Sequence, residues 1–362
     1  MRSTGSSLRV GFVGAGLIAW AHGLGLKALR EGGVADAAVV GVFDPKEGRA
    51  RAFADGVGAE GVFVAPDAAA LARQCDAIWV CTPTSRHRPV VEEALAAGCA
   101  VFCEKPLDRD LVGATALADA VRTAGVPAQC GLVLRSAPVF RSLRALVAGG
   151  SLGEPMAAVF RDDQYFPIRG TYASHWRADV TQAGGGCLIE HSIHDVDILR
   201  YCFGEVDSVA ARTANHAGYE GIEDVATVSL AFSSGFEAHL TSVWHDIMSR
   251  GSTRRLEVFF REGMVWLEDE FRGPLHVQTS EGIDVRACPS PGWVDALPLP
   301  NDEIGLALRA YVEADRGFVD AVTQGNAPEP GLDVALVAHR LVDAAYRSAA
   351  GTGTGLAFGL WC

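Results

Sequence analysis

The sequence lacks a long hydrophobic run, paired cysteines and an apolar leader segment. No stretch approaches the roughly 18 apolar residues that a membrane-spanning helix needs, so we expect no contact with a membrane. The N-terminal residues MRSTGSSLRV contain no apolar segment of signal-peptide length. The nine cysteines are scattered without a C-x-x-C pair, which argues against a zinc ribbon and a disulfide framework. We therefore expect a cytoplasmic protein with reduced, mostly buried cysteines.

Basic residues are outnumbered by acidic ones. The chain has 44 acidic residues against 31 lysines and arginines, which gives a formal net charge of -13. A nucleic-acid-binding or anionic-membrane surface needs a basic patch, so neither partner is expected. The length of 362 residues, with 49% hydrophobic and 21% charged residues, is typical of a globular enzyme with two domains.

Short apolar runs alternate with alanine-rich stretches over the first 130 residues. The runs at 9–16, 37–44, 61–66, 76–83, 99–106 and 127–133 predict strands, and the stretches between them predict helices. This alternation favours a parallel sheet that is covered by helices on both faces. We therefore predict an α/β Rossmann dinucleotide-binding domain over residues 1–130.

The pattern of apolar runs changes over residues 131–362. Strand-like segments at 156–166, 206–216, 224–232, 235–244, 254–260 and 263–269 are joined in part by the turn signals SSG and REG. They predict an α+β domain with a large open, mainly antiparallel sheet for substrate binding and oligomerisation. Two helices follow at 301–322 and 331–349, and we expect the last one, near 331–350, to pack back on the first domain.

The first strand-to-helix junction carries a dinucleotide-binding pattern, Gly14-x-Gly16-x-x-Ala19. Gly14 suits a tight turn, Gly16 suits close approach of a pyrophosphate to the helix N-terminus, and Ala19 suits close helix–strand packing. Asp44 ends the second strand, where a carboxylate binds ribose hydroxyls and repels a 2′-phosphate. NAD is therefore favoured, although the nearby Lys46 leaves room for NADP. The alternative is that Asp44 only caps the next helix.

Two further strand ends belong to the same edge of the predicted sheet. One carries Thr82 and Pro83, with His87 in the following turn, and the other carries Glu104 and Lys105. A lysine at this edge can hydrogen-bond a substrate hydroxyl and assist its deprotonation. The predicted cofactor site comprises Gly14, Gly16, Leu17, Ile18, Ala19, Asp44, Thr82, Pro83, His87, Glu104 and Lys105.

The stretch GGGCLIEHSIHDVDILR, residues 184–200, concentrates histidines and carboxylates after three glycines. As one helix it would place Glu190, His194 and Asp197 within about 60° of each other on a polar stripe, with His191 further round. Three interpretations compete: a metal site, a solvated face and a proton-transfer site. No further ligand set has a recognisable spacing, so we predict no metal. A histidine held by a carboxylate suits a general base, and proton transfer is favoured.

Five motifs in order, GAGLIA, TPTSRH, EKP, HWR and AGGGCLIEHSIHDVDILRY, resemble the glucose–fructose oxidoreductase/inositol dehydrogenase/rhizopine catabolism (Gfo/Idh/MocA) family over nearly the whole chain. The resemblance implies a Rossmann domain, an open antiparallel sheet and a homodimer or homotetramer through that sheet. It also implies that Lys105 is the lysine of the E-K-P motif and that His194 relays the substrate proton. Glu190 stands where the family more often has aspartate.

The sequence therefore predicts a dehydrogenase that transfers hydride between NAD and a secondary alcohol of a sugar, a cyclitol or an amino-sugar glycoside. The predicted catalytic residues are Lys105, His194 and Glu190; the predicted substrate residues are Lys105, Trp176, Arg177, Glu190, His191 and His194. Two alternatives remain: a glycosidase that oxidises its substrate transiently with bound NAD, and a non-catalytic dinucleotide sensor. Carboxylates at 162, 163, 179, 190, 195 and 197 suit an amino sugar if they line the pocket, but dispersal over solvated faces is the commoner arrangement.

Overall fold

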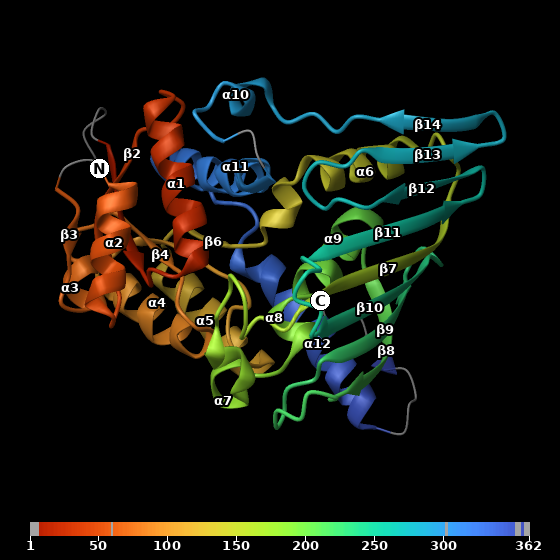
Figure 1. Ribbon diagram of the computed structural model, residues 1–362, viewed down its shortest axis with the longest axis horizontal. Helices are drawn as coiled ribbons and strands as arrows, with labels where there is room; N and C mark the ends of the chain where they lie inside the picture. The colour runs from red at the N-terminus through yellow and green to blue at the C-terminus, as the bar shows by residue number, and fades with distance from the viewer. Residues whose placement is uncertain (1–6, 59–60, 301–302, 352–355, 358–362) are drawn as a thin grey trace. The chain divides into compact units, whose positions relative to one another are not determined.

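The computed structural model describes residues 7–58, 61–300, 303–351 and 356–357 (Figure 1). The chain forms two compact units. Unit 1 contains the residues up to Asp108, Val112–Val133 and Ser290–Leu336, and unit 2 contains Arg109–Leu111, Leu134–Pro289 and the residues from Val337 onward. The expected division into 1–130 and 131–362 differs from this one mainly because residues 290–336 belong to unit 1. The expected C-terminal helix spans the division, which falls after Leu336.

Unit 1 is built on a six-stranded parallel sheet in the order β3-β2-β1-β4-β5-β6. Its strands are β1 (Leu8–Val13), β2 (Ala37–Phe43), β3 (Phe63–Val64), β4 (Ala77–Val80), β5 (Ala100–Cys103) and β6 (Ala128–Cys130). Its helices are α1 (Leu17–Glu31), α2 (Glu47–Val57), α3 (Ala68–Ala72), α4 (His87–Ala96), α5 (Leu111–Ala124), α10 (Gly292–Asp295) and α11 (Glu303–Gln324). This order is the doubly wound arrangement, whose switch point between β1 and β4 is a binding crevice for dinucleotides.

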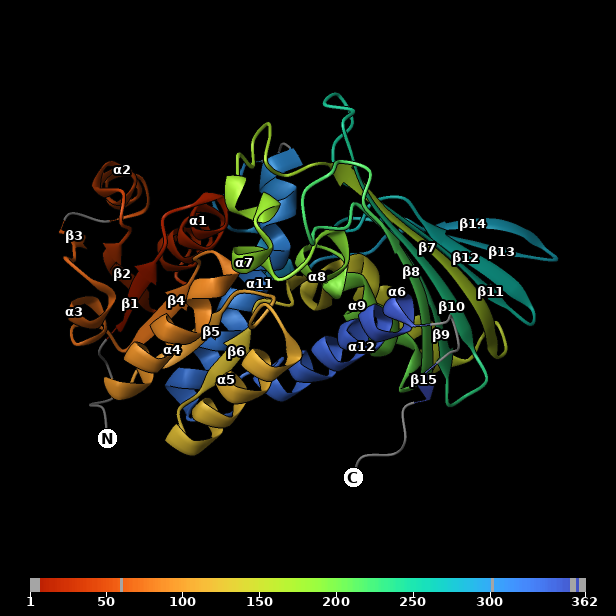
Figure 2. The same ribbon diagram turned by 90° about the horizontal axis from the view of Figure 1, so that it is seen from below.

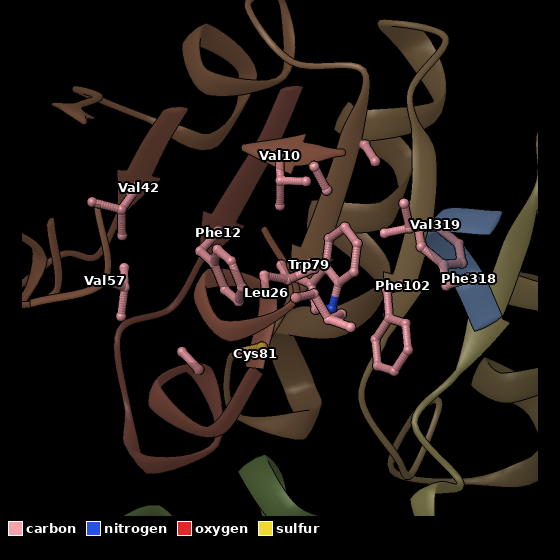
Figure 3. Close-up of a cluster of buried hydrophobic side chains, with 14 of the residues drawn as sticks. Val10, Phe12, Leu26, Val42, Val57, Trp79, Cys81, Phe102, Phe318 and Val319 are labelled. Carbon is pink, nitrogen blue, oxygen red and sulfur yellow. The ribbon is translucent and has the colours of Figure 1, made fainter. Parts of the chain in front are cut away.

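The strands of unit 1 are continuous apolar runs because both of their faces are covered. Side chains of β1, β4 and β5 on one face pack against α1, α2 and α11, and Figure 3 shows Phe12, Trp79, Phe102 and Phe318 within this core. The rings of Trp79 and Phe102 are stacked with centroids 5.4 Å apart, and Phe318 of α11 meets Trp79 edge-on at 4.9 Å. Helix α11 is therefore part of this core, although it follows β6 by more than 150 residues.

Unit 2 is built on a nine-stranded mainly antiparallel sheet in the order β14-β13-β12-β11-β7-β10-β9-β8-β15. The strands are β7 (Pro155–Tyr165), β8 (Val206–Ala214), β9 (Val225–Phe232), β10 (Glu237–His245), β11 (Thr253–Phe260), β12 (Gly263–Leu267), β13 (Leu275–Thr279), β14 (Gly282–Arg286) and β15 (Leu356–Ala357). Within this sheet, only the central pair of β7 and β10 is parallel among the described strands. The helices are α6 (Pro138–Gly149), α7 (Val180–Ala183), α8 (Cys187–Glu190), α9 (Ile193–Phe203) and α12 (Leu332–Ala350).

One face of this sheet is covered and the other is open. Helices α6, α8 and α9 lie against the covered face, and Figure 2 shows no helix of the described chain on the other. The alternation in β9 follows from this, because Ala226, Val228 and Leu230 are buried while Thr227 and Ser229 are exposed. The fold class predicted from the sequence is confirmed in both units.

Several sequence expectations can be refined. Strands β13 and β14 and helix α6 were not expected. Strand β13 extends the sheet from the expected β12, β14 pairs with β13, and α6 packs on α9. The eight described cysteines are free, and all of them except the partly buried Cys288 are buried. Among the described residues, no helix combines the length and the low polarity that crossing a membrane requires.

Candidate active site

The turn after β1 has the shape that a dinucleotide-binding turn requires. Gly14 has φ +94°, and a Cβ there would lie 2.4 Å from the Cys81 carbonyl oxygen, so only glycine fits. Gly16 is the N-cap of α1, no side chain caps this helix end, and a Cβ at Gly16 would meet nothing within 4 Å. The open space at an uncapped helix N-terminus fits a pyrophosphate. Ala19 is buried and Leu17 is exposed at the first turn of the helix.

Asp44 follows β2 beside this turn. Its carboxylate accepts hydrogen bonds from the backbone N–H of Ala15 at 2.9 Å and from that of Lys46 at 2.8 Å. The N-cap of α2 is Lys46, and no side chain caps α2. Asp44 therefore fixes the glycine turn and is not the N-cap of α2. Each oxygen retains a lone pair for a ribose hydroxyl, so the residue fits the predicted NAD preference.

The end of β4 leads into a polar turn. The buried side-chain oxygen of Thr82 has no hydrogen-bond partner among the described residues, and such an atom fits a bound polar group. His87 is buried, and its two ring nitrogens lie 2.8 Å from the Pro106 carbonyl oxygen and 3.0 Å from the Thr82 carbonyl oxygen. His87 thus links the two strand ends to each other. Its predicted contact with the cofactor stays a prediction, as do those of Ile18 and Pro83.

Lys105 follows β5 at the same sheet edge, and its side chain is half-buried. The preceding Glu104 points inward, where its carboxylate lies 3.1 Å from Nε2 of His22. Glu104 therefore belongs to the interior of unit 1, and its predicted cofactor contact is untested. Lys105 comes directly after it, so the interior contacts of Glu104 fix the start of the Lys105 segment.

In unit 2, the three glycines before Cys187 make room for protein backbone. A Cβ at Gly184 would lie 2.1 Å from the Arg109 carbonyl oxygen, and one at Gly186 would lie 1.8 Å from that of Glu223. Glycine is therefore required at these positions by the neighbouring backbone. The Glu223 carboxylate also accepts the N–H groups of Gly186 at 2.7 Å and Leu188 at 3.0 Å.

Tyr346 of α12 completes this anchor. Its hydroxyl donates to Glu223 at 2.8 Å and lies 3.3 Å from the Ile189 N–H. Neither residue was expected from the sequence, because their partners lie 35 to 157 positions away. These hydrogen bonds of Glu223 and Tyr346 fix residues 186–189, and Glu190, His191 and His194 follow them in the chain.

The prediction that one helix carries Glu190, His194 and Asp197 is wrong. Helix α8 ends at Glu190, His191 has φ -123° and ψ -60°, and α9 begins at Ile193. The Ser192 hydroxyl instead bonds Asp162 at 2.7 Å and Ser242 at 2.6 Å in the interior. Glu190 and His194 are thus not one turn apart on one helix. The alternative of a solvated helix face is also wrong, because His194, Asp195 and Asp197 are buried.

Glu190 is paired with Arg177. The guanidinium Nε lies 3.1 Å from Glu190 Oε2, and the same guanidinium lies over the Trp176 ring at 4.3 Å. The Glu190 side chain is buried, whereas that of Arg177 is 23% exposed. The structure therefore brings together three of the predicted substrate residues, Trp176, Arg177 and Glu190. The Trp176 ring and the Arg177 guanidinium are partly exposed.

His191 lies on a buried ionic cluster. Its Nε2 is 3.1 Å from Asp162 Oδ1, and Arg254 contacts Asp195 at 2.6 Å and Glu270 at 3.4 Å. Burial, reinforced by the neighbouring Asp162 carboxylate and opposed by Arg254, raises the pKa of Asp195 to about 7. Arg254 thus faces three carboxyl groups of this cluster, those of Asp162, Asp195 and Glu270.

Most of the carboxylates that suggested an amino-sugar substrate form ion pairs with arginines. Asp197 forms two 2.7 Å hydrogen bonds with Arg135, and Asp163 bonds Arg250. Asp179 instead caps α7 through Thr181. These contacts remove the support for an uncompensated acidic pocket. Within the described ranges, no three His, Cys, Asp or Glu side chains are grouped to hold a metal ion.

Comparison with known proteins agrees with both halves of this description. Residues 8–132 match the family model described as "Oxidoreductase family, NAD-binding Rossmann fold", and residues 140–266 match the "GFO/IDH/MocA C-terminal domain". The chain is 31% identical to scyllo-inositol 2-dehydrogenase (NAD(+)) of Bacillus subtilis (strain 168) over 271 residues, which cover 72% of this chain and 73% of the relative.

Two further similarities extend over almost the whole chain. Inositol 2-dehydrogenase of Rhizobium meliloti (strain 1021) is 29% identical over 351 residues, 95% of this chain and 97% of the relative. A crystal structure of levoglucosan dehydrogenase in complex with NADH and levoglucosan matches with a TM-score of 0.83 at 20% identity, covering 97% of this chain and 99% of that one. The last likeness shows a shared fold.

Proposed function

Because the chain belongs to the Gfo/Idh/MocA family of NAD-binding oxidoreductases, we propose that it oxidises or reduces one secondary alcohol carbon of a sugar or cyclitol. It is an NAD-dependent oxidoreductase that acts on CH–OH groups. One observation supports the proposal above the others. Lys105 follows β5 at the sheet edge where the Gly14 turn, Asp44 and Thr82 fit the dinucleotide.

The residues of this chain have separate roles in the proposed reaction. Bound NAD supplies the hydride acceptor, and the protein supplies binding, orientation and proton transfer. Lys105 hydrogen-bonds the substrate hydroxyl and polarises it, and His194 accepts the proton as the alcohol is oxidised. In the reverse direction the same histidine returns the proton.

Glu190 has a different proposed role from the one inferred from a continuous helix. Its buried carboxylate holds Arg177 at 3.1 Å, and Arg177 lies over Trp176. We assign Trp176 to stacking on the apolar face of a sugar ring, Arg177 and His191 to hydrogen bonding with its hydroxyls, and Glu190 to holding Arg177 in place. Neutral sugars and cyclitols fit these groups better than amino sugars, since the nearby carboxylates are already paired with arginines.

A homodimer or homotetramer through the open face of the nine-stranded sheet is also proposed. Strand pairing puts Val159 beside Glu257, and Ala157 beside Phe259, on this face. Val159 is 48% exposed and Phe259 38% exposed, and Trp266 stacks on His276 in the adjoining strands. An apolar strip on a sheet face is typical of an association surface. Light scattering of the purified chain and of Phe259→Glu tests this, and a monomeric parent protein would refute it.

Turnover of the purified chain tests the proposed reaction. NAD and NADP are supplied separately with a panel of inositols, neutral sugars, amino sugars and glycosides, and nicotinamide absorbance is followed. We expect NAD reduction with at least one polyol, and a loss of kcat of about 100-fold or more in Lys105→Ala and in His194→Ala. NAD affinity of His194→Ala should stay within about 3-fold of the parent value, which controls for misfolding.

The other outcomes are informative as well. Release of an aglycone without added NAD would indicate the glycosidase alternative. Tight NAD binding without turnover on any panel member would indicate the sensor.

A further inference from the structure

His22 is a completely buried histidine in the middle of α1, and both of its ring nitrogens face carboxylates. Nδ1 lies 2.6 Å from Oδ1 of Asp315 on α11, and Nε2 lies 3.1 Å from Oε1 of Glu104 after β5. Trp79 of β4 donates its indole N–H to the same Asp315 oxygen at 3.0 Å. Four elements of unit 1 therefore meet at this imidazole.

The surroundings favour a protonated ring. Complete burial by itself lowers the pKa of His22, but the carboxylates of Asp315 and Glu104 outweigh burial and raise it to about 10. The rings of Phe102 and Tyr311 pack edge-on against the imidazole at 4.8 and 5.3 Å, and the Cys81 thiol lies near both carboxylates. As an imidazolium, His22 can donate to both carboxylates at once, which a neutral ring cannot do.

Glu104 connects the contacts of His22 to the segment that carries Lys105. Its carboxylate occupies the space beside Gly131, where a Cβ would lie 2.2 Å from Oε1, and its backbone N–H donates to the Val80 carbonyl at 3.1 Å. Side chain and backbone are thus held by separate partners, and the next residue is Lys105. An unpaired buried carboxylate is costly, so loss of the imidazolium protonates or displaces Glu104, and either change removes the contact that holds its carboxyl group here.

We propose that His22 is a positioning residue: bridged to Asp315 on α11, it holds the Glu104 carboxylate and thereby fixes the start of the segment that carries Lys105. This inference rests on the proposed role of Lys105 for its kinetic consequence, but its structural part does not depend on that role. Neither His22 nor Asp315 touches substrate in this proposal.

Two amide variants separate positioning from simple packing. The amide of a glutamine matches the Nε2 position and can still donate to Glu104, while the amide of an asparagine matches Nδ1 and reaches only Asp315. Both His22→Gln and His22→Asn remove the positive charge, and His22→Asn removes one methylene group more, so the Lys27 reference described below reports the effect of the lost volume. We expect kcat to stay within about 5-fold of the parent value in His22→Gln and to fall about 30-fold or more in His22→Asn, with the NAD Kd within about 3-fold in both.

A second readout does not need turnover. The chain has three lysines, Lys27, Lys46 and Lys105, so amine labelling followed by peptide mass spectrometry reports each of them. Lys46 is an exposed reference, and Lys27 lies on α1 with His22 and reports general loosening of that helix. We expect the ratio of Lys105 to Lys46 labelling to rise about 5-fold or more in His22→Asn and less than 2-fold in His22→Gln, with Lys27 unchanged.

Each outcome supports or overturns the proposed role of His22. Equal labelling and equal kcat in the two variants overturn the proposal, as does a rise at Lys27 that matches the rise at Lys105. If the parent protein turns over no alcohol, the proposed function fails, and the labelling ratio alone still tests the anchoring. If His22→Asn does not fold, Asp315→Asn replaces it, because that variant loosens His22 while Trp79 keeps an acceptor; unchanged Lys105 labelling there overturns the proposal.

Discussion

Gly14 and Gly16 are two residues apart, yet the structure predicts opposite consequences for the same substitution. In Gly14→Ala the new Cβ meets the Cys81 carbonyl oxygen at 2.4 Å, and the φ of +94° is strained for any side chain. The strain costs about 1–2 kcal/mol and the overpacking about 1–3 kcal/mol. In Gly16→Ala the Cβ enters open space at φ -82°, and the loss of a glycine N-cap costs at most about 1 kcal/mol.

Thermal unfolding without cofactor measures the first consequence. For a unit of this size, 1 kcal/mol shifts Tm by about 2–4 °C, so Gly14→Ala should lower Tm by roughly 5–15 °C and Gly16→Ala by less than about 4 °C. Calorimetric titration with NAD measures the second. The methyl group of Gly16→Ala occupies the space that a pyrophosphate needs, so its Kd should rise about 10-fold or more although the protein is folded.

The pair of variants is its own control, since both add one methyl group to one turn. Equal losses of Tm in the two variants would refute the steric account of Gly14. An unchanged NAD affinity in Gly16→Ala would refute the assignment of the open space to the pyrophosphate.

Three further outcomes follow from contacts described above. Asp44→Ser should weaken NAD binding about 10-fold and NADP binding less, so that the ratio of the two Kd values moves toward NADP; an unchanged ratio contradicts the ribose assignment. Tyr346→Phe removes the hydroxyl that donates to Glu223, so the free energy of unfolding should fall by about 1 kcal/mol and kcat should fall several-fold. NAD affinity should stay unchanged, which shows that unit 1 is intact. The stability due to His22, whose pKa of about 10 exceeds the unfolded value, should be fully present below about pH 6.5 and be lost as pH rises through 10. A Tm difference between parent and His22→Gln that does not shrink over this range contradicts the ion-pair account.

The sequence predicted those features that depend on local patterns. Apolar runs of strand length, separated by helical stretches, suffice for a doubly wound sheet, and the spacing of Gly14 and Gly16 locates its turn. Alternation along residues 224–232 likewise predicts a sheet with one covered face.

Features that depend on distant partners were not predictable in this way. The helix break at His191 follows from the Ser192 hydroxyl, which bonds Asp162 and Ser242 from two strands of the sheet, 30 and 50 positions away. The pattern of hydrophobic residues contains no information about such bonds. His22 looks like one polar residue in an apolar helix, and its partner Asp315 is 293 positions away.

The return of residues 290–336 to unit 1 has a consequence for how the protein is made. Phe318 and Val319 complete the core around Trp79 and Phe102 (Figure 3), together with Val312. Asp315 completes the pairing of His22. A ribosome has therefore synthesised all fourteen strands from β1 to β14 before the nucleotide-binding unit can close. Until then, the apolar surface beside β4 and β5 is open to chaperones and to aggregation, and a fragment that ends near residue 133 keeps it open permanently.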